Sequence, residues 1–174
     1  MANWLFYVME WFEQCGGWEK AVRKGLAVQH YPHPGWTGAY QNLPLLQQIK
    51  KDDWLVAGRA VRFAGYAHCK SDFYSGGRFL AVNPCDGLDP LEFRERVDVQ
   101  WYLVPGFEDK RNWLDLHDLK DDLMQEAAAR GESAKWSEID FRPGRCVWPI
   151  SKAVFERVRR RLDAAGAKRY RNPR

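Results

Sequence analysis

The strongest constraint on the fold is a pair of short apolar runs in the first half of the chain. The runs cover residues 54–57 and 61–67, with Gly58-Arg59 close to the turn between them. Short apolar runs separated by a turn are typical of a buried β-hairpin. We therefore expect a strand pair here, and the rest of the chain must supply further strands beside it and helices over it.

Three other segments carry strand patterns. Residues 97–104 alternate strictly, and the side that we expect to face the core consists of Val97, Val99, Trp101 and Leu103. Residues 3–9 are apolar throughout, which favours a strand buried on both faces. Residues 146–150 suit a short closing strand, and Pro149 restricts it to an edge of the sheet.

Amphipathic spacing predicts helices over residues 18–28, 113–130 and 152–165. Ser151 is a suitable N-cap for the last of them. Residues 166–174 form a basic tail that we expect to be loose. Helices interspersed with short strands indicate an α+β fold, in the form of a small curved β-barrel with flanking helices.

Charge is distributed unevenly along the 174 residues. The whole chain has a net charge of +4, but residues 151–174 hold nine Lys or Arg against Glu156 and Asp163, a net +7, which leaves −3 for residues 1–150. A local basic segment favours a phosphate-bearing partner or an acidic surface. The alternative is a solvated helix face followed by a frayed tail.

Composition and motifs exclude several classes of protein. With 45% apolar and 29% charged residues, the chain is typical of one folded domain. The cysteines show no C-x-x-C pair and no histidine at ligand spacing, so we expect reduced thiols and no zinc site; they are Cys15, Cys69, Cys85 and Cys146. A signal peptide and a membrane span are absent from the sequence pattern. We therefore expect a cytoplasmic protein without a metal or cofactor.

The familiar catalytic motifs are also missing. The sequence contains no phosphate-binding G-x-x-x-x-G-K-[ST] loop, no dinucleotide-binding G-x-G-x-x-G, no H-E-x-x-H and no G-x-S-x-G. Glu92 and Glu95 fall on a predicted surface helix, where a solvated, salt-linked face is the ordinary interpretation. The residues therefore favour a binding module over an enzyme.

Aromatic side chains in predicted loops are the more suggestive feature, although each of them also suits an ordinary core. A flat ring can stack on a nucleobase for about 1–3 kcal/mol per base. Gln41 and Asn42 lie beside such rings and can both donate to and accept from a base edge. Arg59 and Arg78 lie in or near the same loops and could contact phosphates.

An ordered set of motifs resembles the EVE domain of the PUA-like superfamily, which is related to YTH domains. The set comprises NWLFYVM at 3–9, WTGAYQN at 36–42, IKKDDWLVA at 49–57 and FAGYA at 63–67. The strand at 97–104 and the segment CVWPISKAVFERV resemble later elements of the family. The sequence departs from the family pattern at Asp52, which replaces a turn glycine, and at residues 107–145, which resemble a helical insertion.

The resemblance implies a single PUA-like domain over residues 1–165 with an aromatic pocket for a modified nucleobase. In that family the base is a modified cytosine, such as 5-methylcytosine, or a methylated adenine. The domain often serves as the reader module of a modification-dependent restriction system. Carried over to this chain, the resemblance implies one pocket wall made of Trp36, Tyr40, Gln41 and Asn42. We add Trp11, Phe73 and Tyr74 because they lie in neighbouring aromatic loops.

The leading hypothesis is a non-catalytic reader that captures a modified base, by base flipping, from DNA rather than RNA. Phosphate contacts are assigned to Arg59, Arg78, Arg157 and Arg160, and a nuclease or NTPase is the expected fused or associated partner. One alternative is a small PUA-like enzyme acting on RNA or a small amide, with a site drawn from Glu10, Lys50, Lys51 and Asp53. Another is a protein-interaction domain with a tryptophan-rich interface.

Overall fold

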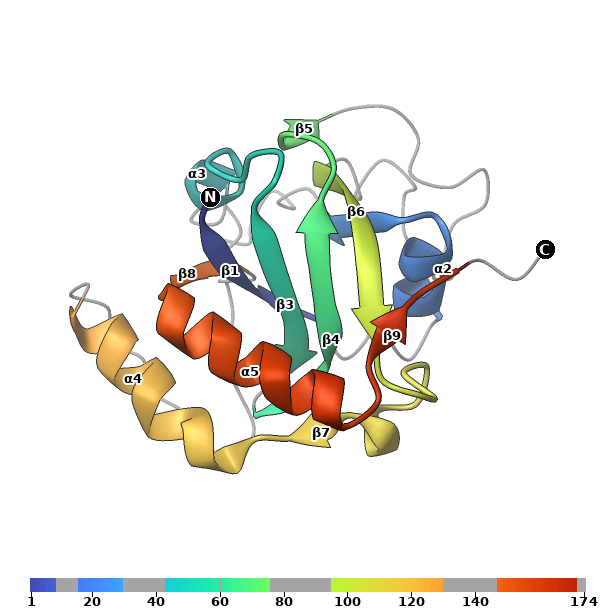
Figure 1. Ribbon diagram of the computed structural model, residues 1–174. Coiled ribbons are helices and arrows are strands. Elements are labelled where there is room, and N and C mark those ends of the chain that lie inside the picture. Colours follow the sequence, from blue (N-terminus) through green and yellow to red (C-terminus); the bar gives the residue numbers. More distant parts are fainter. Residues whose placement is uncertain (9–15, 30–42, 60, 76–94, 130–146, 172–174) are drawn as a thin grey trace, which may run out of the picture.

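Nine strands form one curved sheet in the computed structural model, which describes residues 1–8, 16–29, 43–59, 61–75, 95–129 and 147–171. The main strands follow the order β2-β6-β4-β3-β1-β8 and curl into an open half-barrel (Figure 1). Their bounds are β1 Asn3–Tyr7, β2 Leu26–Gln29, β3 Trp54–Arg59, β4 Arg62–Cys69, β6 Glu95–Leu103 and β8 Val147–Ile150. The short strands are β5 Tyr74–Ser75, β7 Leu114–Asp115 and β9 Lys168–Arg169.

Helices lie on both faces of this sheet. The α-helices are α2 Gly17–Arg23, α3 Leu43–Leu46, α4 Lys120–Ala129 and α5 Lys152–Ala164, and two 3-10 turns are η3 Lys110–Asn112 and η4 His117–Leu119. Helix α5 crosses one face, with α4 beside it, and α2 lies against the other face (Figure 1). In the described part of the chain, no helix is long and apolar enough to cross a membrane. The predicted α+β class is therefore confirmed.

The predicted hairpin is confirmed, and it forms the centre of the sheet. Strands β3 and β4 pair antiparallel, with a bulge between Ala57 and Gly58. The sequence suggested that Gly58 and Arg59 lie close to the turn, but both residues belong to β3. On the other side of β3, strand β1 pairs in parallel, and β1 also pairs antiparallel with β8. The N-terminal strand therefore has a partner on each edge, and its side chains from Trp4 to Phe6 are buried.

Asp53 ties this N-terminal strand to the turn before β3. The side chain is 3% exposed. Its carboxylate accepts hydrogen bonds from the backbone N–H of Ala2, from Trp4 Nε1 at 3.1 Å and from the backbone N–H of Lys50 at 3.0 Å. The preceding residue, Asp52, has a φ of 73°, in the left-handed region that favours glycine. The Lys-Lys-Asp-Asp turn is thus a structural element.

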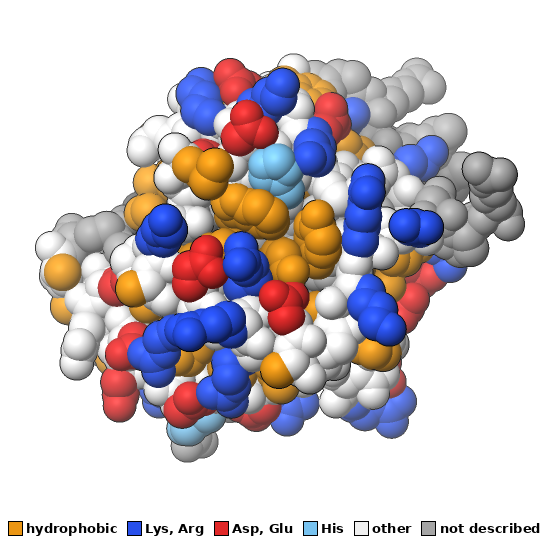
Figure 2. All heavy atoms as spheres, viewed as in Figure 1, with side chains coloured by type: hydrophobic (Ala, Val, Ile, Leu, Met, Phe, Trp, Pro, Cys, Tyr) orange, Lys and Arg blue, Asp and Glu red, His pale blue; other side chains and the backbone are white. Residues whose placement is uncertain are grey.

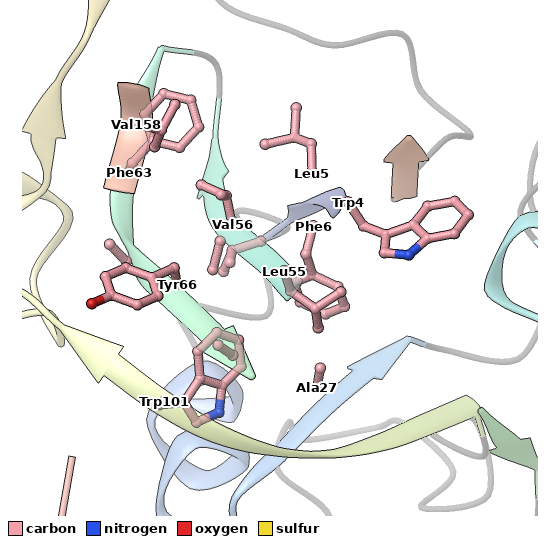
Figure 3. Close-up of a cluster of buried hydrophobic side chains, with 14 of the residues drawn as sticks. Trp4, Leu5, Phe6, Ala27, Leu55, Val56, Phe63, Tyr66, Trp101 and Val158 are labelled. Atoms are coloured by element: carbon pink, nitrogen blue, oxygen red, sulfur yellow. The ribbon is translucent and has the colours of Figure 1, made fainter. Parts of the chain in front are cut away.

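The core has two layers, one on each face of the sheet. On the α2 side, the Trp101 ring packs edge-on against Trp18 at 5.0 Å and against Phe6 at 6.5 Å. On the α5 side, Leu5 and Val158 lie near Val56 (Figure 3). Burying each such side chain contributes about 1.5–3 kcal/mol. Strand alternation separates the two layers because neighbouring residues point to opposite faces.

Two local predictions are confirmed in detail. Helix α5 begins after Ser151, whose hydroxyl accepts a hydrogen bond from the backbone N–H of Val154 at 3.2 Å. Its inward stripe is buried as expected and consists of Val154, Phe155, Val158 and Leu162. In β6 the alternate residues from Val97 to Leu103 are buried, while Asp98 is exposed.

Three segments differ in extent from the prediction, each because of strand pairing or burial against distant residues. The helix expected over 18–28 ends at Arg23, because Gly25 turns the chain at a φ of 67° and the following residues pair with β6 as β2. The helix expected over 113–130 begins only at Lys120. Before it, Trp113 is buried and donates from Nε1 to the Phe107 carbonyl at 2.7 Å, and β7 pairs with β4.

The C-terminal tail is the third correction. The sequence predicted a loose segment, but Lys168 and Arg169 form β9, which pairs with the end of β6. The backbone N–H of Tyr170 then donates to the Trp101 carbonyl at 2.9 Å. Strand pairing holds this basic segment because the C-terminal half of β6 has an open edge there. Arg169 is thereby fixed beside Tyr102.

Replacing Asp53 with alanine is expected to lower the free energy of unfolding by about 3 kcal/mol. The loss follows because three N–H donors at a buried site would lose their acceptor. Chemical denaturation of both proteins measures it. The matched control is Asp72→Ala, which removes an exposed carboxylate that accepts from the backbone N–H of Lys51, and little change is expected there. Equal effects of the two substitutions would contradict the structural role of Asp53.

Gly65→Ala is expected to destabilise the sheet by about 3 kcal/mol or more. A Cβ at Gly65 would lie 2.2 Å from the backbone oxygen of Tyr102, which belongs to a paired strand and cannot move aside. Gly16→Ala is the control, because its Cβ would meet nothing within 4 Å and only the φ of 75° would cost about 1 kcal/mol. Thermal unfolding of both variants distinguishes crowding from backbone strain, and equal melting temperatures would refute the crowding.

Candidate nucleic-acid interface

Two strands, β2 and β5, end beside the same residue at the start of β6. Gln29 at the end of β2 and Ser75 at the end of β5 both pair with Glu95 at the start of β6, from opposite sides. In the chain, the predicted wall 36–42 follows Gln29. The segment 76–94, which contains Arg78, joins Ser75 to Glu95. Gln29 and Ser75, the last described residues before these two segments, therefore lie at one end of the sheet.

Most of the predicted base-binding residues lie outside the described residues. These are Trp11, Trp36, Tyr40, Gln41 and Asn42, together with Arg78 among the predicted phosphate contacts. Their roles stay predictions. Phe73, Tyr74, Arg59, Arg157 and Arg160 are described.

Tyr74 and Phe73 differ in their exposure. Tyr74 is 37% exposed in β5, and its hydroxyl donates to Asp98 Oδ1 at 2.8 Å. Partial burial, and then this hydrogen bond and the charge of Asp98, raise the pKa of Tyr74 to about 12. Phe73 is half-buried against the core, and its backbone N–H donates to the Ile49 carbonyl at 3.1 Å. Tyr74 is thus partly exposed at this end of the sheet with its hydroxyl held by Asp98, whereas Phe73 packs against the core.

Two charged residues at this end were not recognised as site residues from the sequence. Glu95, assigned to a surface helix, instead begins β6 and is 3% exposed, and it accepts a hydrogen bond from Ser75 Oγ at 2.9 Å. Arg96 is 7% exposed, and burial lowers its pKa. No local pattern indicates this burial, because it arises only when β2 and β5 flank β6. Buried charge beside a predicted binding segment is typical of a functional site.

Arg59 occupies a different environment from the one expected. It is 5% exposed in β3, and its Cζ lies 5.9 Å from the centre of the Trp113 ring. A buried guanidinium beside an indole stabilises the fold through a cation–π contact. In this arrangement Arg59 is not presented at the surface for phosphate binding.

The basic residues of α5 are exposed but partly engaged. Arg157 forms an ion pair with Asp122 of α4, and Arg161 pairs with Asp118 of η4 at 2.8 Å. Together with Leu119 and Arg160, these two arginines line a hollow of about 320 Å³. Such exposed pairs hold α4 against α5 only weakly, so the arginines remain available to an anionic partner.

The residues proposed for an enzymatic alternative do not form a catalytic cluster where they are described. Asp53 is saturated by three N–H donors. Lys50 and Lys51 are exposed, and Lys50 pairs with Asp72 at 3.6 Å. Glu10 lies outside the described residues. Within the described ranges, no group of three or more His, Cys, Asp or Glu side chains could hold a metal ion. Burial raises the pKa of Cys69 to about 12, so this thiol is a poor nucleophile.

The Tyr74–Asp98 hydrogen bond gives a pH-dependent prediction. Because the folded-state pKa of Tyr74 is raised above the ordinary value of 10, its contribution to stability is complete below pH 10 and is lost as pH rises towards 12. The difference in melting temperature between wild type and Tyr74→Phe should therefore be constant up to pH 9 and shrink between pH 10 and 12. A difference that stays constant across this range would contradict the assignment.

The sequence matches no family model and no curated protein. The fold does match solved structures. Rpa0253 from Rhodopseudomonas palustris has a TM-score of 0.50 at 14% identity, covering 94% of each chain. PSPTO5229 from Pseudomonas syringae has a TM-score of 0.50 at 14% identity, covering 90% of this chain and 97% of the other. At this identity the two matches show a shared fold alone.

Human THYN1, solved in complex with DNA containing 5-methylcytosine, is also similar. It covers 97% of this chain and 99% of its own at 16% identity, but its TM-score of 0.46 is too low to bear on function. The curled half-barrel with its flanking helices is the architecture that the EVE resemblance implied. The chain therefore has an α+β fold similar to that of Rpa0253 and PSPTO5229.

Proposed function

We propose that this protein is a non-catalytic reader of a modified nucleobase in nucleic acid. One observation supports the proposal: β2, which precedes the predicted wall 36–42, and β5, which carries the predicted base-binding Tyr74, pair with Glu95 from opposite sides. The motif WTGAYQN at 36–42, which resembles the EVE family, lies in the first of these segments. Its rings would stack on the base, and its amides would bond to the base edge.

The physical chemistry of capture is consistent with this role. A methyl group adds apolar surface to a base. An aromatic cage removes that surface from water, which favours binding. Extrusion of the base from a duplex costs a few kcal/mol, which stacking and edge hydrogen bonds must offset. Arg157 and Arg160 on α5 would add phosphate contacts that carry no sequence information.

We further propose which base is modified, which nucleic acid carries it and in which system the protein acts. The base is a modified cytosine, such as 5-methylcytosine, or a methylated adenine, flipped out of DNA rather than taken from RNA. The protein would act in the cytoplasm as part of a restriction system, with a nuclease or NTPase as its fused or associated partner. The modified base and the restriction system follow from the EVE resemblance, and the claims are separable in experiments.

Binding to matched oligonucleotides tests the proposal. Fluorescence anisotropy should show at least about tenfold tighter binding to a duplex with 5-methylcytosine or N6-methyladenine than to the unmodified duplex. Trp36→Ala should remove about 1–3 kcal/mol of that preference, the usual contribution of one stacked ring. Leu114→Ala is the control and should leave the preference unchanged. Leu114 lies in β7, which pairs with the start of β4, whereas β5 follows the end of β4.

The same assay separates the finer claims. RNA strands carrying the same modified bases decide between DNA and RNA, and 2-aminopurine placed next to the modified base should gain fluorescence if the base flips. Equal, weak binding to modified and unmodified strands, unaffected by Trp36→Ala, would refute base reading.

A further inference from the structure

A group of four rings lies on the sheet face that carries α5. Strand alternation and register place Trp54 beside His68, and Tyr66 beside Tyr102. Figure 2 looks onto this face and shows hydrophobic side chains gathered next to a histidine, with Lys and Arg side chains around them. We refer to Trp54, Tyr66, His68 and Tyr102 as the ring patch.

The rings of this patch are ordered by stacking. The Trp54 and His68 rings are 4.7 Å apart at 29°, and the Tyr66 and Tyr102 rings are 4.9 Å apart at 6°. Tyr66 is 6% exposed, and its hydroxyl donates to Asp163 Oδ1 of α5 at 2.6 Å. The other three rings are partly exposed. Helix α5 therefore holds Tyr66 and leaves the other three rings partly open to solvent.

Tyr102 has one covered ring face and one that points towards β9. Tyr66 stacks on the side of β4, and β9 pairs with β6 on the other side, with Arg169 opposite Tyr102. Arg169 Nε donates to Gln100 Oε1 at 3.0 Å, which holds the guanidinium group along this edge. Aromatic rings and guanidinium planes are the two kinds of surface on which proteins stack unpaired bases, and Tyr102 and Arg169 lie side by side here.

The charges around the ring patch complement a phosphate chain. The acidic groups of this face are engaged: Asp52 with His68 at 3.3 Å, Asp163 with Tyr66, and Glu156 with Arg159 at 3.3 Å. In contrast, none of the ion pairs among the described residues includes the basic side chains beside the patch, which are Lys70 and Arg169. Lys70 Nζ lies 2.6 Å from His68 Nδ1, so positive charge borders the rings directly.

We propose that the ring patch binds single-stranded nucleic acid independently of any base modification. One base stacks on the open face of Tyr102 against Arg169, and the phosphates of the strand contact Lys70. A duplex fits poorly because its bases cover each other's faces. The patch uses none of the residues assigned to the modified-base pocket, so this binding goes beyond the reader function and can be measured separately from it.

A short oligothymidylate and an abasic strand of equal length test the stacking. Wild-type protein should bind the oligothymidylate several-fold more tightly than the abasic strand, because only the former has bases to stack. Tyr102→Leu keeps an apolar side chain but removes the ring, and we expect it to lose about fivefold or more in affinity for oligothymidylate. A thermal melt confirms that the variant is folded, and Tyr102→Phe should retain the binding of wild type.

Charge reversal tests the phosphate contacts. Arg169→Glu should weaken binding and lower the salt dependence by at least the contribution of one phosphate contact, a slope of about 0.7. Lys24→Glu is the matched control, since Lys24 is exposed at the end of α2 on the other face of the sheet. It should leave both the affinity and the slope close to those of wild type.

The binding experiments test the ring patch separately from the reader function. Equal binding of oligothymidylate and abasic strands, or unchanged binding by Tyr102→Leu, would overturn the proposal. Equal losses from Arg169→Glu and Lys24→Glu would do the same, since they would indicate a general effect of charge. Trp36→Ala should leave oligothymidylate binding intact. Wild-type protein that binds oligothymidylate but shows no preference for modified bases would reject the reader function alone.

Discussion

The pairing of strand β6 along both of its edges is the constraint on which the other parts of the structure depend. Its inner side chains, above all Trp101, must pack against Trp18 and Phe6 to form the core. That packing forces the intervening residues, such as Gln100 and Tyr102, onto the opposite face. Because β6 also pairs with β2, β4, β5 and β9, its orientation determines where each of these strands presents its side chains.

Local patterns predicted the elements whose stability is mainly local. Helix α5 has its cap and its apolar stripe within one stretch of sequence, and β6 shows its alternation within eight residues. The segment around Trp113 failed as a helix because burial of that indole and pairing of β7 outweigh helix propensity. The tail residues Lys168 and Arg169 carry no strand signal of their own, and only the open edge of β6 makes them a strand.

The candidate sites depend on pairing between distant strands, which one sequence does not reveal. Glu95 looks like an ordinary surface carboxylate until β2 and β5 are placed on either side of it. Likewise, Tyr66 and Tyr102 are well separated in the chain, and register alone makes them stacked neighbours. The residues Trp36 to Asn42 could be proposed for the pocket because their motif resembles that of a known family, whereas the ring patch has no such motif.

The enclosed position of β1 has a consequence for how the chain reaches its fold. Leu5 faces Val56 on one side and Trp148 on the other, so the first strand needs a partner from near the other end of the chain. Such non-local pairing slows folding, because the ends must meet before the contacts form. During synthesis β1 can pair with β3 early, but its second edge stays open until β8 has left the ribosome. The apolar segment at residues 3–9 is then the part of the nascent chain most in need of protection from aggregation.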